Sequence, residues 1–214
     1  ERGGIEVEED AFAGGLNWLE KMTDGTIGYN SPGGLNARPE GLQERFRAED
    51  SAAMSAAGLW GFGLLARRGP TVANLKGPIK HCKSLPPRWS GSFIDMYYWY
   101  YGSLAMFAQG KSDWKKWSKP LEKALLKHQC AQPEAVMGSW DPVGPWGFDG
   151  GRIYSTCFNA LALLTPYRYG PEFMKGKPPK AYADAVAALR TFAKSEDEDL
   201  AARAKLWLTR AGAR

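Results

Sequence analysis

Three aspartates and one arginine stand where the sequence passes from a turn to an apolar segment. They are Asp95, Asp141, Asp149 and Arg152. A carboxyl group at such a junction can act as a general acid, and a nearby guanidinium can stabilise the charge that develops. The same positions also suit an aspartate that caps a helix and pairs with arginine. We expect the capping role to prevail, so the three aspartates remain only candidates for catalysis.

Aromatic side chains gather around the same junctions and can form a binding surface. Tyrosine and tryptophan bury a large apolar ring and keep one polar atom for a partner, which suits an apolar ligand or a glycan. The candidate ligand-binding residues are Tyr98, Tyr101, Trp140, Trp146, Arg152 and Tyr154. Aromatic residues of enclosed helices also serve simply as core, and we favour that role while keeping the binding role open.

Metal and thiol chemistry has few candidates. Cys82, Cys130 and Cys157 show no CxxC spacing, and His81 and His128, the two histidines, fall in amphipathic segments. We therefore expect no metal site and no cofactor. Cys82 and Cys130 occupy similar places in two such segments, so a disulfide between them is an alternative, which depends on a compartment that the sequence does not reveal.

The composition is that of a folded globular chain with an uneven charge. The 214 residues are 44% apolar and 13% aromatic. No segment approaches the roughly 20 consecutive apolar residues of a membrane span. Residues 1–50 carry 11 acidic and 5 basic side chains, and the remainder carries 12 acidic and 23 basic ones. No nucleic-acid recognition motif accompanies the basic part, so we do not expect nucleic acid as a partner.

The segments that position these residues alternate between amphipathic and fully apolar helices. Amphipathic helices are predicted over residues 5–22, 72–85 and 114–129, and apolar helices over 51–68, 93–107 and 152–167. The aromatic run within 93–107 also has strand propensity, but its apolar spacing favours a buried helix. A polar loop follows the first helix, and two amphipathic helices over 182–194 and 196–210 close the chain.

This alternation predicts an all-α fold in two layers. A helix that is apolar on every side must be enclosed, whereas an amphipathic helix faces water on one side. We expect a single domain over residues 1–214, with hairpins of about 5–68, 72–109 and 114–167 and closing helices over 182–210. A step from a small residue to leucine recurs at Gly58, Ser103 and Ala160. A tetratricopeptide or armadillo solenoid is the competing architecture, but its repeats are shorter or more regular.

Three short segments carry a family resemblance. Residues 24–29 form an Asp-Gly-Thr-Ile-Gly-Tyr turn, Gln129 precedes Gly-Ser-Trp at 138–140, and residues 150–156 open the third apolar helix. Together they resemble the prenyltransferase and squalene-oxidase repeat family, whose α/α toroids include squalene-hopene cyclases and protein prenyltransferase β subunits. With the aromatic run at 97–102, the chain is most similar to squalene-cyclase-like domains of large, mostly uncharacterised bacterial proteins.

The resemblance implies an incomplete α/α toroid of three to four helical hairpins, with amphipathic outer and apolar inner helices. Cyclases of the family protonate an alkene with an Asp-x-Asp-Asp cluster, which this chain lacks, and Ser155 stands where prenyltransferases have a zinc-binding histidine. Serine is a poor zinc ligand. The favoured function is therefore a non-catalytic binding or scaffold domain of a larger protein or assembly, using its concave aromatic face or its open edge.

Two other functions remain open. One is a terpene-cyclase, prenyltransferase-like or polysaccharide-acting enzyme with Asp95, Asp141 or Asp149 as the acid and with Tyr98 and Trp140 in its pocket. The other is an anionic-ligand binder that uses the basic face of residues 111–127. The expected partners are other protein segments or subunits and an apolar or glycan ligand. Because the sequence begins at Glu1, we interpret the chain as a fragment or processed product of a bacterial protein. Its compartment is not determined by the sequence, and the cell envelope and the secreted fraction are both considered.

Overall fold

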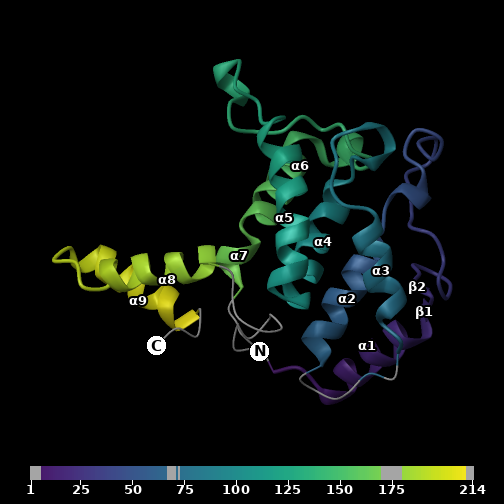
Figure 1. Ribbon diagram of the computed structural model, residues 1–214, viewed down its shortest axis with the longest axis horizontal. Coiled ribbons are helices and arrows are strands. Elements are labelled where there is room, and N and C mark those ends of the chain that lie inside the picture. The colour runs from purple at the N-terminus through teal and green to yellow at the C-terminus, as the bar shows by residue number, and fades with distance from the viewer. Residues whose placement is uncertain (1–5, 67–70, 72, 170–179, 211–214) are drawn as a thin grey trace.

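The computed structural model describes residues 6–66, 71, 73–169 and 180–210, and it is helical apart from one very short pair of strands (Figure 1). The predicted all-α class is confirmed. The elements are α1 (Glu9–Lys21), β1 (Thr23–Asp24), β2 (Thr26–Ile27), α2 (Ala53–Leu65), α3 (Lys76–Ser84), α4 (Met96–Gln109), α5 (Lys111–Leu126), α6 (Gly147–Leu163), α7 (Thr165–Arg168), α8 (Lys180–Phe192) and α9 (Glu198–Arg210).

The apolar helices α2, α4 and α6 form one row, in which α4 lies between the other two (Figure 1). The amphipathic helices α3 and α5 pack on α2 and α4, and α1 also packs on α2. On α3, Lys83 places its Nζ atom 2.9 Å from Oδ2 of Asp113 on α5, which links the two amphipathic helices. The aromatic run is a buried helix, α4, as its spacing predicts.

Small residues let the helices approach each other closely. Gly102 on α4 packs against the Trp117 ring of α5, so that a Cβ atom at Gly102 would collide with that ring. The Trp117 indole donates a hydrogen bond of 3.0 Å to Ser103 Oγ. On α2, a Cβ atom at Gly58 would lie 2.6 Å from Ile27 Cδ1. At two of the predicted small-to-leucine steps, a large side chain from another element therefore packs against the small residue: Ile27 against Gly58 and Trp117 against Ser103.

The turn at residues 24–29 folds into the β1–β2 hairpin. Thr23 pairs with Ile27 and Asp24 with Thr26 in an antiparallel register. Gly25 connects the strands with a φ of 67°, a conformation that residues with a Cβ atom rarely adopt. The hairpin directs Ile27 into the core, where 2% of its surface is exposed. The loop that follows is irregular, as predicted.

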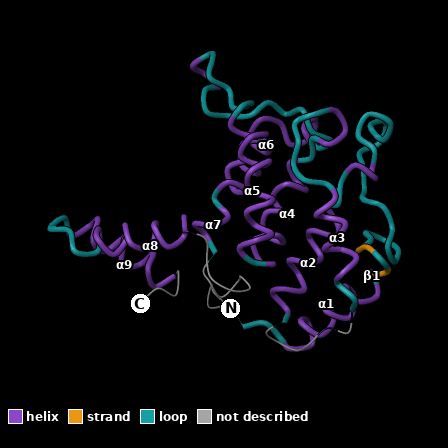
Figure 2. The backbone as a smooth tube through the Cα atoms, viewed as in Figure 1, coloured by secondary structure: helices purple, strands orange, loops and turns teal. Residues whose placement is uncertain are grey.

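The prediction that the third apolar helix is enclosed is wrong. Ile153 is 80% exposed and Phe148 is 71% exposed. The residues of α6 that are buried are small or polar: Gly147, Ser155, Asn159 and Ala162. The physical reason is the position of α6 at the end of the row, next to α4 but with no further helix of the row beyond it, while the α8–α9 hairpin extends away from the body (Figures 1 and 2).

The boundaries of the elements differ from the prediction at several ends. The third apolar helix begins at Gly147 rather than Arg152, and Gly151 interrupts it with a φ of 62°. The end predicted for the second helix at residues 67–68 lies outside the described residues. Within the described part of the chain, no helix is both long and apolar enough to cross a membrane.

Candidate functional site

The described structure contains a cavity of about 510 Å³ where the N-terminal ends of α2, α4 and α6 meet the loop of residues 29–38. We call it the aromatic cavity. Aromatic and other apolar side chains dominate its wall, together with three polar residues. The lining residues are Tyr29, Asn36, Ala37, Arg38, Ala53, Met54, Tyr97, Trp146, Asp149, Gly150, Tyr154 and Phe158.

Asn36 ties the irregular loop to the start of α2. Its Nδ2 atom donates to the carbonyl oxygens of Ala48 and Ser51, at 3.0 and 2.6 Å. Its Oδ1 atom accepts a hydrogen bond of 2.8 Å from the backbone N–H of Met54. This bond satisfies a donor in the first turn of α2, which the helix itself leaves without a partner. Ser51, which precedes the N-cap Ala52, accepts a hydrogen bond of 3.2 Å from Ala53 N through its Oγ atom.

A buried ion pair lies beneath the aromatic cavity. Arg38 places its Nη2 atom 3.1 Å from Asp95 Oδ2, and the two side chains are 3% and 0% exposed. The Arg38 Nε atom donates to the carbonyl of Phe46 at 3.0 Å. Arg38 therefore connects the loop of residues 29–38 to the N-terminal end of α4, where Asp95 is located.

Both carboxylate oxygens of Asp95 already have partners. Oδ1 accepts from the backbone N–H of Tyr98 at 3.0 Å, which makes Asp95 the N-cap of α4. Oδ2 accepts from Ser51 Oγ at 2.9 Å and contacts Arg38. Because the carboxylate is fully buried and both of its oxygens are engaged by protein groups, a substrate in the aromatic cavity cannot reach it without breaking these contacts. The expected capping role of Asp95 is confirmed.

One wall of the aromatic cavity consists of tilted rings from α4 and α6, backed by Tyr101. The centroids of Tyr154 and Phe158 lie 4.6 Å apart, those of Tyr97 and Phe158 5.8 Å, and those of Tyr97 and Tyr101 4.7 Å. Burial, with a smaller effect of Tyr101, raises the pKa of Tyr97 to about 12. Burial likewise raises the pKa of Tyr154. Both phenols are therefore hydrogen-bond donors at neutral pH.

The Tyr154 hydroxyl has no hydrogen-bond partner among the described residues, although it is buried. A buried polar group without a partner is uncommon, because its desolvation costs about 1–3 kcal/mol. Tyr154 lines the aromatic cavity. A ligand that accepts a hydrogen bond there would remove this cost.

Three of the predicted site residues line the aromatic cavity, namely Trp146, Asp149 and Tyr154. Trp146 and Asp149 lie at the start of α6, before the interruption at Gly151. Tyr101 lies behind Tyr97, one helical turn further along α4, with the two rings tilted by 48°.

Two predicted site residues belong to the core and are absent from the cavity wall. Tyr98 is 2% exposed, and its hydroxyl donates to the carbonyl of Leu85 at 2.9 Å. Trp140 is 3% exposed, and its indole N–H donates to the carbonyl of Leu125 at 2.9 Å. Their polar atoms hold helix ends and loops together, which agrees with the favoured interpretation of these rings as core, and neither residue lines the aromatic cavity.

Asp141 and Arg152 form a separate pair away from the aromatic cavity. Their ion pair joins the loop after α5 to α6, as expected of Arg152 and one of the aspartates, whereas the expected cap by Asp141 is not formed, because the N-cap of α6 is Trp146. The guanidinium also donates to Ser139 Oγ at 3.0 Å. Both side chains remain partly exposed, at 57% for Asp141 and 36% for Arg152. This pair fixes the Gly-Ser-Trp turn rather than forming a binding surface.

The cysteines and histidines form neither the disulfide nor a metal cluster in the described part of the chain. All three cysteines are free, so the disulfide between Cys82 and Cys130 does not form. His81 lies with Nδ1 3.2 Å from Ser55 Oγ, and burial lowers its pKa. Within residues 6–66, 71, 73–169 and 180–210, no three His, Cys, Asp or Glu side chains gather as they would around a metal ion.

Sequence reasoning missed several cavity residues, chiefly Tyr29, Arg38, Tyr97 and Phe158. Tyr29 and Arg38 come from an irregular loop, where no periodicity indicates which side chains point inward. Tyr97 is adjacent to the predicted Tyr98, and one residue along a helix turns the side chain by about 100°. A buried arginine in a Gly/Pro-rich loop leaves no signal in composition.

Comparisons of this chain with protein-family models, with curated proteins and with solved structures found no match. The site therefore has to be interpreted from its own geometry.

Proposed function

We propose that this chain is a non-catalytic binding domain, an incomplete α/α toroid whose aromatic cavity holds a compact ring that carries hydroxyl groups, such as a sugar unit of a glycan. The observation that carries the proposal is the cavity of about 510 Å³ at the ends of the three inner helices. Its volume is typical of small-molecule sites. Its predominantly apolar wall with a few polar groups is also typical of such sites.

The side chains of the wall suit a hydroxylated ring. A sugar presents C–H groups on one face, which pack on the aromatic rings of Tyr97, Trp146 and Phe158. Its hydroxyls can accept from the unpartnered Tyr154 O–H and donate to the Asp149 carboxylate. An entirely apolar ligand would leave the buried Tyr154 hydroxyl unpaired, so the wall favours the glycan over the apolar ligand.

The carboxylates support binding rather than catalysis. Glycoside hydrolysis generally uses two carboxyl groups that face each other across about 5–9.5 Å of the site. Asp149 lines the aromatic cavity, whereas Asp95 is fully buried and engaged by Arg38, Ser51 and a backbone N–H. One available carboxylate suits a hydrogen-bond acceptor for a ligand better than a catalytic pair. The alternative of an enzyme on isoprenoid or polysaccharide substrates therefore has less support.

The uncovered side of α6 supports the scaffold part of the proposal. In the row of inner helices α4 has a neighbour on each side, whereas α6 has α4 on one side only. Ile153 and Phe148 are largely exposed there, as are Cys157 and Leu164. A helical hairpin from another protein segment or subunit, placed as the next repeat, would cover this apolar stripe in the way that α4 covers the other side.

Binding of glycans to the purified chain tests the proposal. A panel of neutral glycans is screened, and the best binder is titrated by calorimetry against wild type and three variants. We expect Trp146→Ala to weaken binding at least about 10-fold, because it removes a stacking ring, and Tyr154→Phe about 2- to 10-fold, the usual contribution of one hydrogen bond. Trp18→Ala is the matched control, since Trp18 lies on α1 and is 46% exposed.

Equal weakening by Trp18→Ala, or no glycan bound at millimolar concentration, would overturn the glycan proposal. Turnover of a bound glycan that disappears in Asp149→Asn would replace the binding function with the enzyme alternative. Retained binding without turnover in both wild type and Asp149→Asn supports the non-catalytic domain.

A further inference from the structure

A second cavity, of about 600 Å³, lies on a different part of the molecule and shares no lining residue with the aromatic cavity. We call it the basic cleft. It is formed by the last residue of α3 with the segment after it, and by the second half of α5 with the two residues that follow it. The lining residues are Ser84, Leu85, Pro86, Pro87, Arg88, Trp89, Phe93, Pro120, Lys123, Ala124, Lys127 and His128.

The basic cleft gathers positive charge without a carboxylate in its lining. Arg88 comes from the loop, Lys123 lies in the last turn of α5, and Lys127, four positions further, directly follows the helix. The hydrogen bonds from Arg47 and Ser92 are the main causes of the lowered pKa of Asp50, to which Arg88 also contributes. Asp50 is already bound by two hydrogen bonds from Arg47, at 3.1 and 3.2 Å. The cations of the cleft are therefore available to an anion from outside.

The wall of the basic cleft is held in place before any ligand binds. The rings of Trp89 and His128 are stacked, with centroids 4.5 Å apart and an angle of 3° between their planes. The Nδ1 atom of His128 lies 2.8 Å from the carbonyl oxygen of Ala124, so Nδ1 carries the proton and donates it. The Arg88 guanidinium lies over the Phe93 ring, 3.2 Å from its centroid. Pro86 and Pro87 further restrict the loop.

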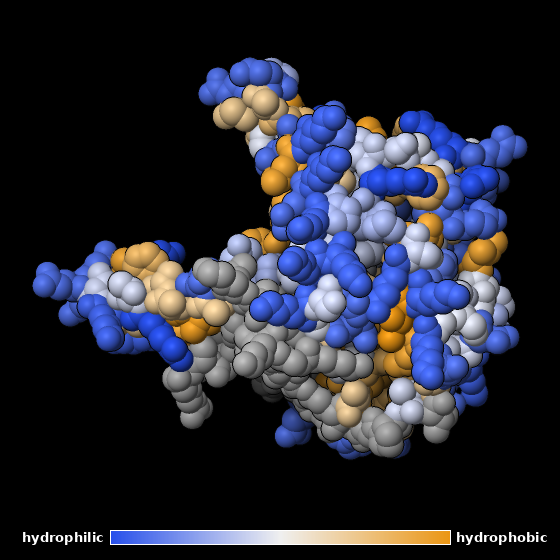
Figure 3. Space-filling model, in the orientation of Figure 1, coloured by the Kyte–Doolittle hydropathy of each residue, from blue (hydrophilic) through white to orange (hydrophobic). Residues whose placement is uncertain are grey.

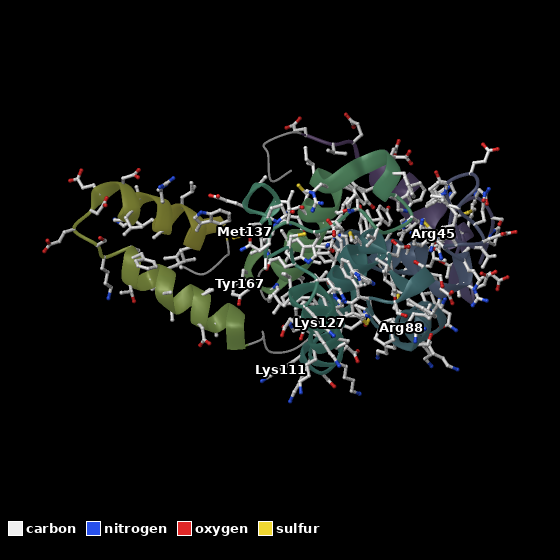
Figure 4. All side chains as sticks on the ribbon, turned by 90° about the horizontal axis from the view of Figure 1, so that it is seen from above. Arg45, Arg88, Lys111, Lys127, Met137 and Tyr167 are labelled. Atoms are coloured by element: carbon white, nitrogen blue, oxygen red, sulfur yellow. The ribbon has the colours of Figure 1, made fainter. Side chains whose placement is uncertain are left out.

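Figure 4 shows Arg88 and Lys127 on the same side of the molecule, and Figure 3 shows the hydrophilic character of the face that carries α3 and α5. Not all of the basic face contributes to the cleft. Lys111, Lys115, Lys116 and Lys119 do not line it. The charge is therefore focused at one end of α5, next to an aromatic and proline wall, rather than spread evenly as on a surface for a long polyanion.

From this convergence we infer that the basic cleft binds a small phosphomonoester that carries a flat ring. A phosphate group has a charge of about −1.5 to −2 at pH 7 and three acceptor oxygens, which match one guanidinium and two ammonium groups. The ring of the ligand packs along the apolar wall formed by the prolines and Trp89. This site is independent of the aromatic cavity and of the function proposed for it.

Calorimetric titration of the purified chain with phenyl phosphate at low salt tests the inference. Inorganic phosphate and phenol are titrated separately, to distinguish the contributions of the charge and the ring. We expect phenyl phosphate to bind more tightly than either, and its affinity to fall as salt is raised, because exposed charges are screened. The double variant Lys123→Gln/Lys127→Gln is expected to weaken binding at least about 10-fold, since it removes two of the three fixed cations.

The matched control is Lys115→Gln/Lys116→Gln, which removes the same charge from the same helix outside the cleft. We expect it to change the affinity for phenyl phosphate less than about 2-fold, the residual effect of a distant, screened charge. Equal losses in the two double variants would overturn the inference, because binding would then follow net charge alone. So would absence of binding at millimolar phenyl phosphate, or tighter binding of a single-stranded oligonucleotide that depends equally on both lysine pairs.

Discussion

Replacing Arg38 by methionine is the sharpest test of the way in which the aromatic cavity is built. Methionine keeps most of the apolar stem but removes the guanidinium that lies 3.1 Å from Asp95 Oδ2 and donates to the Phe46 carbonyl. The variant leaves a carboxylate at 0% exposure without its counter-ion. Removing one partner of a buried ion pair costs about 3–5 kcal/mol, because the remaining charge stays desolvated. We expect Arg38→Met to lower the free energy of unfolding by about 4 kcal/mol.

Urea unfolding followed by circular dichroism and tryptophan fluorescence measures this change. For a chain of this size about 4 kcal/mol corresponds to a fall in Tm of roughly 8–16 °C. Arg45→Met is the control, because Arg45 is an exposed neighbour in the same loop, and we expect a change within about 0.5 kcal/mol.

The double variant Arg38→Met/Asp95→Asn distinguishes the ion pair from simple packing. Asparagine carries no charge, so the double variant is expected to recover about 2 kcal/mol of the loss, which appears as a coupling energy between the two sites. A cost below about 1 kcal/mol for Arg38→Met, or costs that simply add in the double variant, would refute the argument that the buried pair holds the loop to α4.

Three other predictions concern packing and exposure. Gly102→Ala is expected to lower the free energy of unfolding by about 2 kcal/mol, because the added methyl group collides with the Trp117 indole on α5. Gly63→Ala has open space for its methyl group and is expected to stabilise α2 by about 0.5–1 kcal/mol. Denaturant unfolding of the two variants measures both changes. At pH 8 a thiol reagent is expected to modify exposed Cys157 in the native protein and Cys82 only after unfolding, because burial raises the pKa of Cys82 to about 12. Mass spectrometry identifies the modified cysteine, and modification of Cys82 in the native protein would contradict its burial. Ile153→Ser is expected to change the free energy of unfolding by less than about 0.5 kcal/mol, since the side chain is 80% exposed, and a loss of several kcal/mol would show that α6 is covered in solution.

Helix type and most of the layer arrangement followed from local patterns. The apolar composition of α2 and α4 predicted burial on all sides, and both helices are largely buried. The Asp95 cap and the pairing of Arg152 with one of the aspartates followed from residue types at helix junctions, although which aspartate pairs did not. These features depend on neighbours within a few residues, or on an average over a helix, and such information is present in a single sequence.

The membership of the aromatic cavity did not follow from local patterns. Trp146, Asp149 and Tyr154 were predicted because they sit at a helix start, but Tyr98 and Trp140 satisfied the same criterion and lie in the core. The direction of a side chain at a helix start depends on which neighbouring element approaches it. For Tyr98 that neighbour is the end of α3, where the tyrosine hydroxyl lies within hydrogen-bond distance of the carbonyl oxygens of Cys82 and Leu85.

Sequence alone therefore determined the helical class, the alternation of amphipathic and apolar helices, and the caps and turns between them, because periodicity, glycine, proline and short polar side chains act within one or two helical turns. Only the tertiary structure decided which apolar helix stays uncovered, which aromatic rings surround a cavity, and which cations converge on the basic cleft. Arg38 and Asp95 are 57 positions apart in the sequence and Arg88 and Lys123 are 35 apart. Each pair is brought together only when the helices pack, since burial of the apolar row sets the distance between segments that share no local signal.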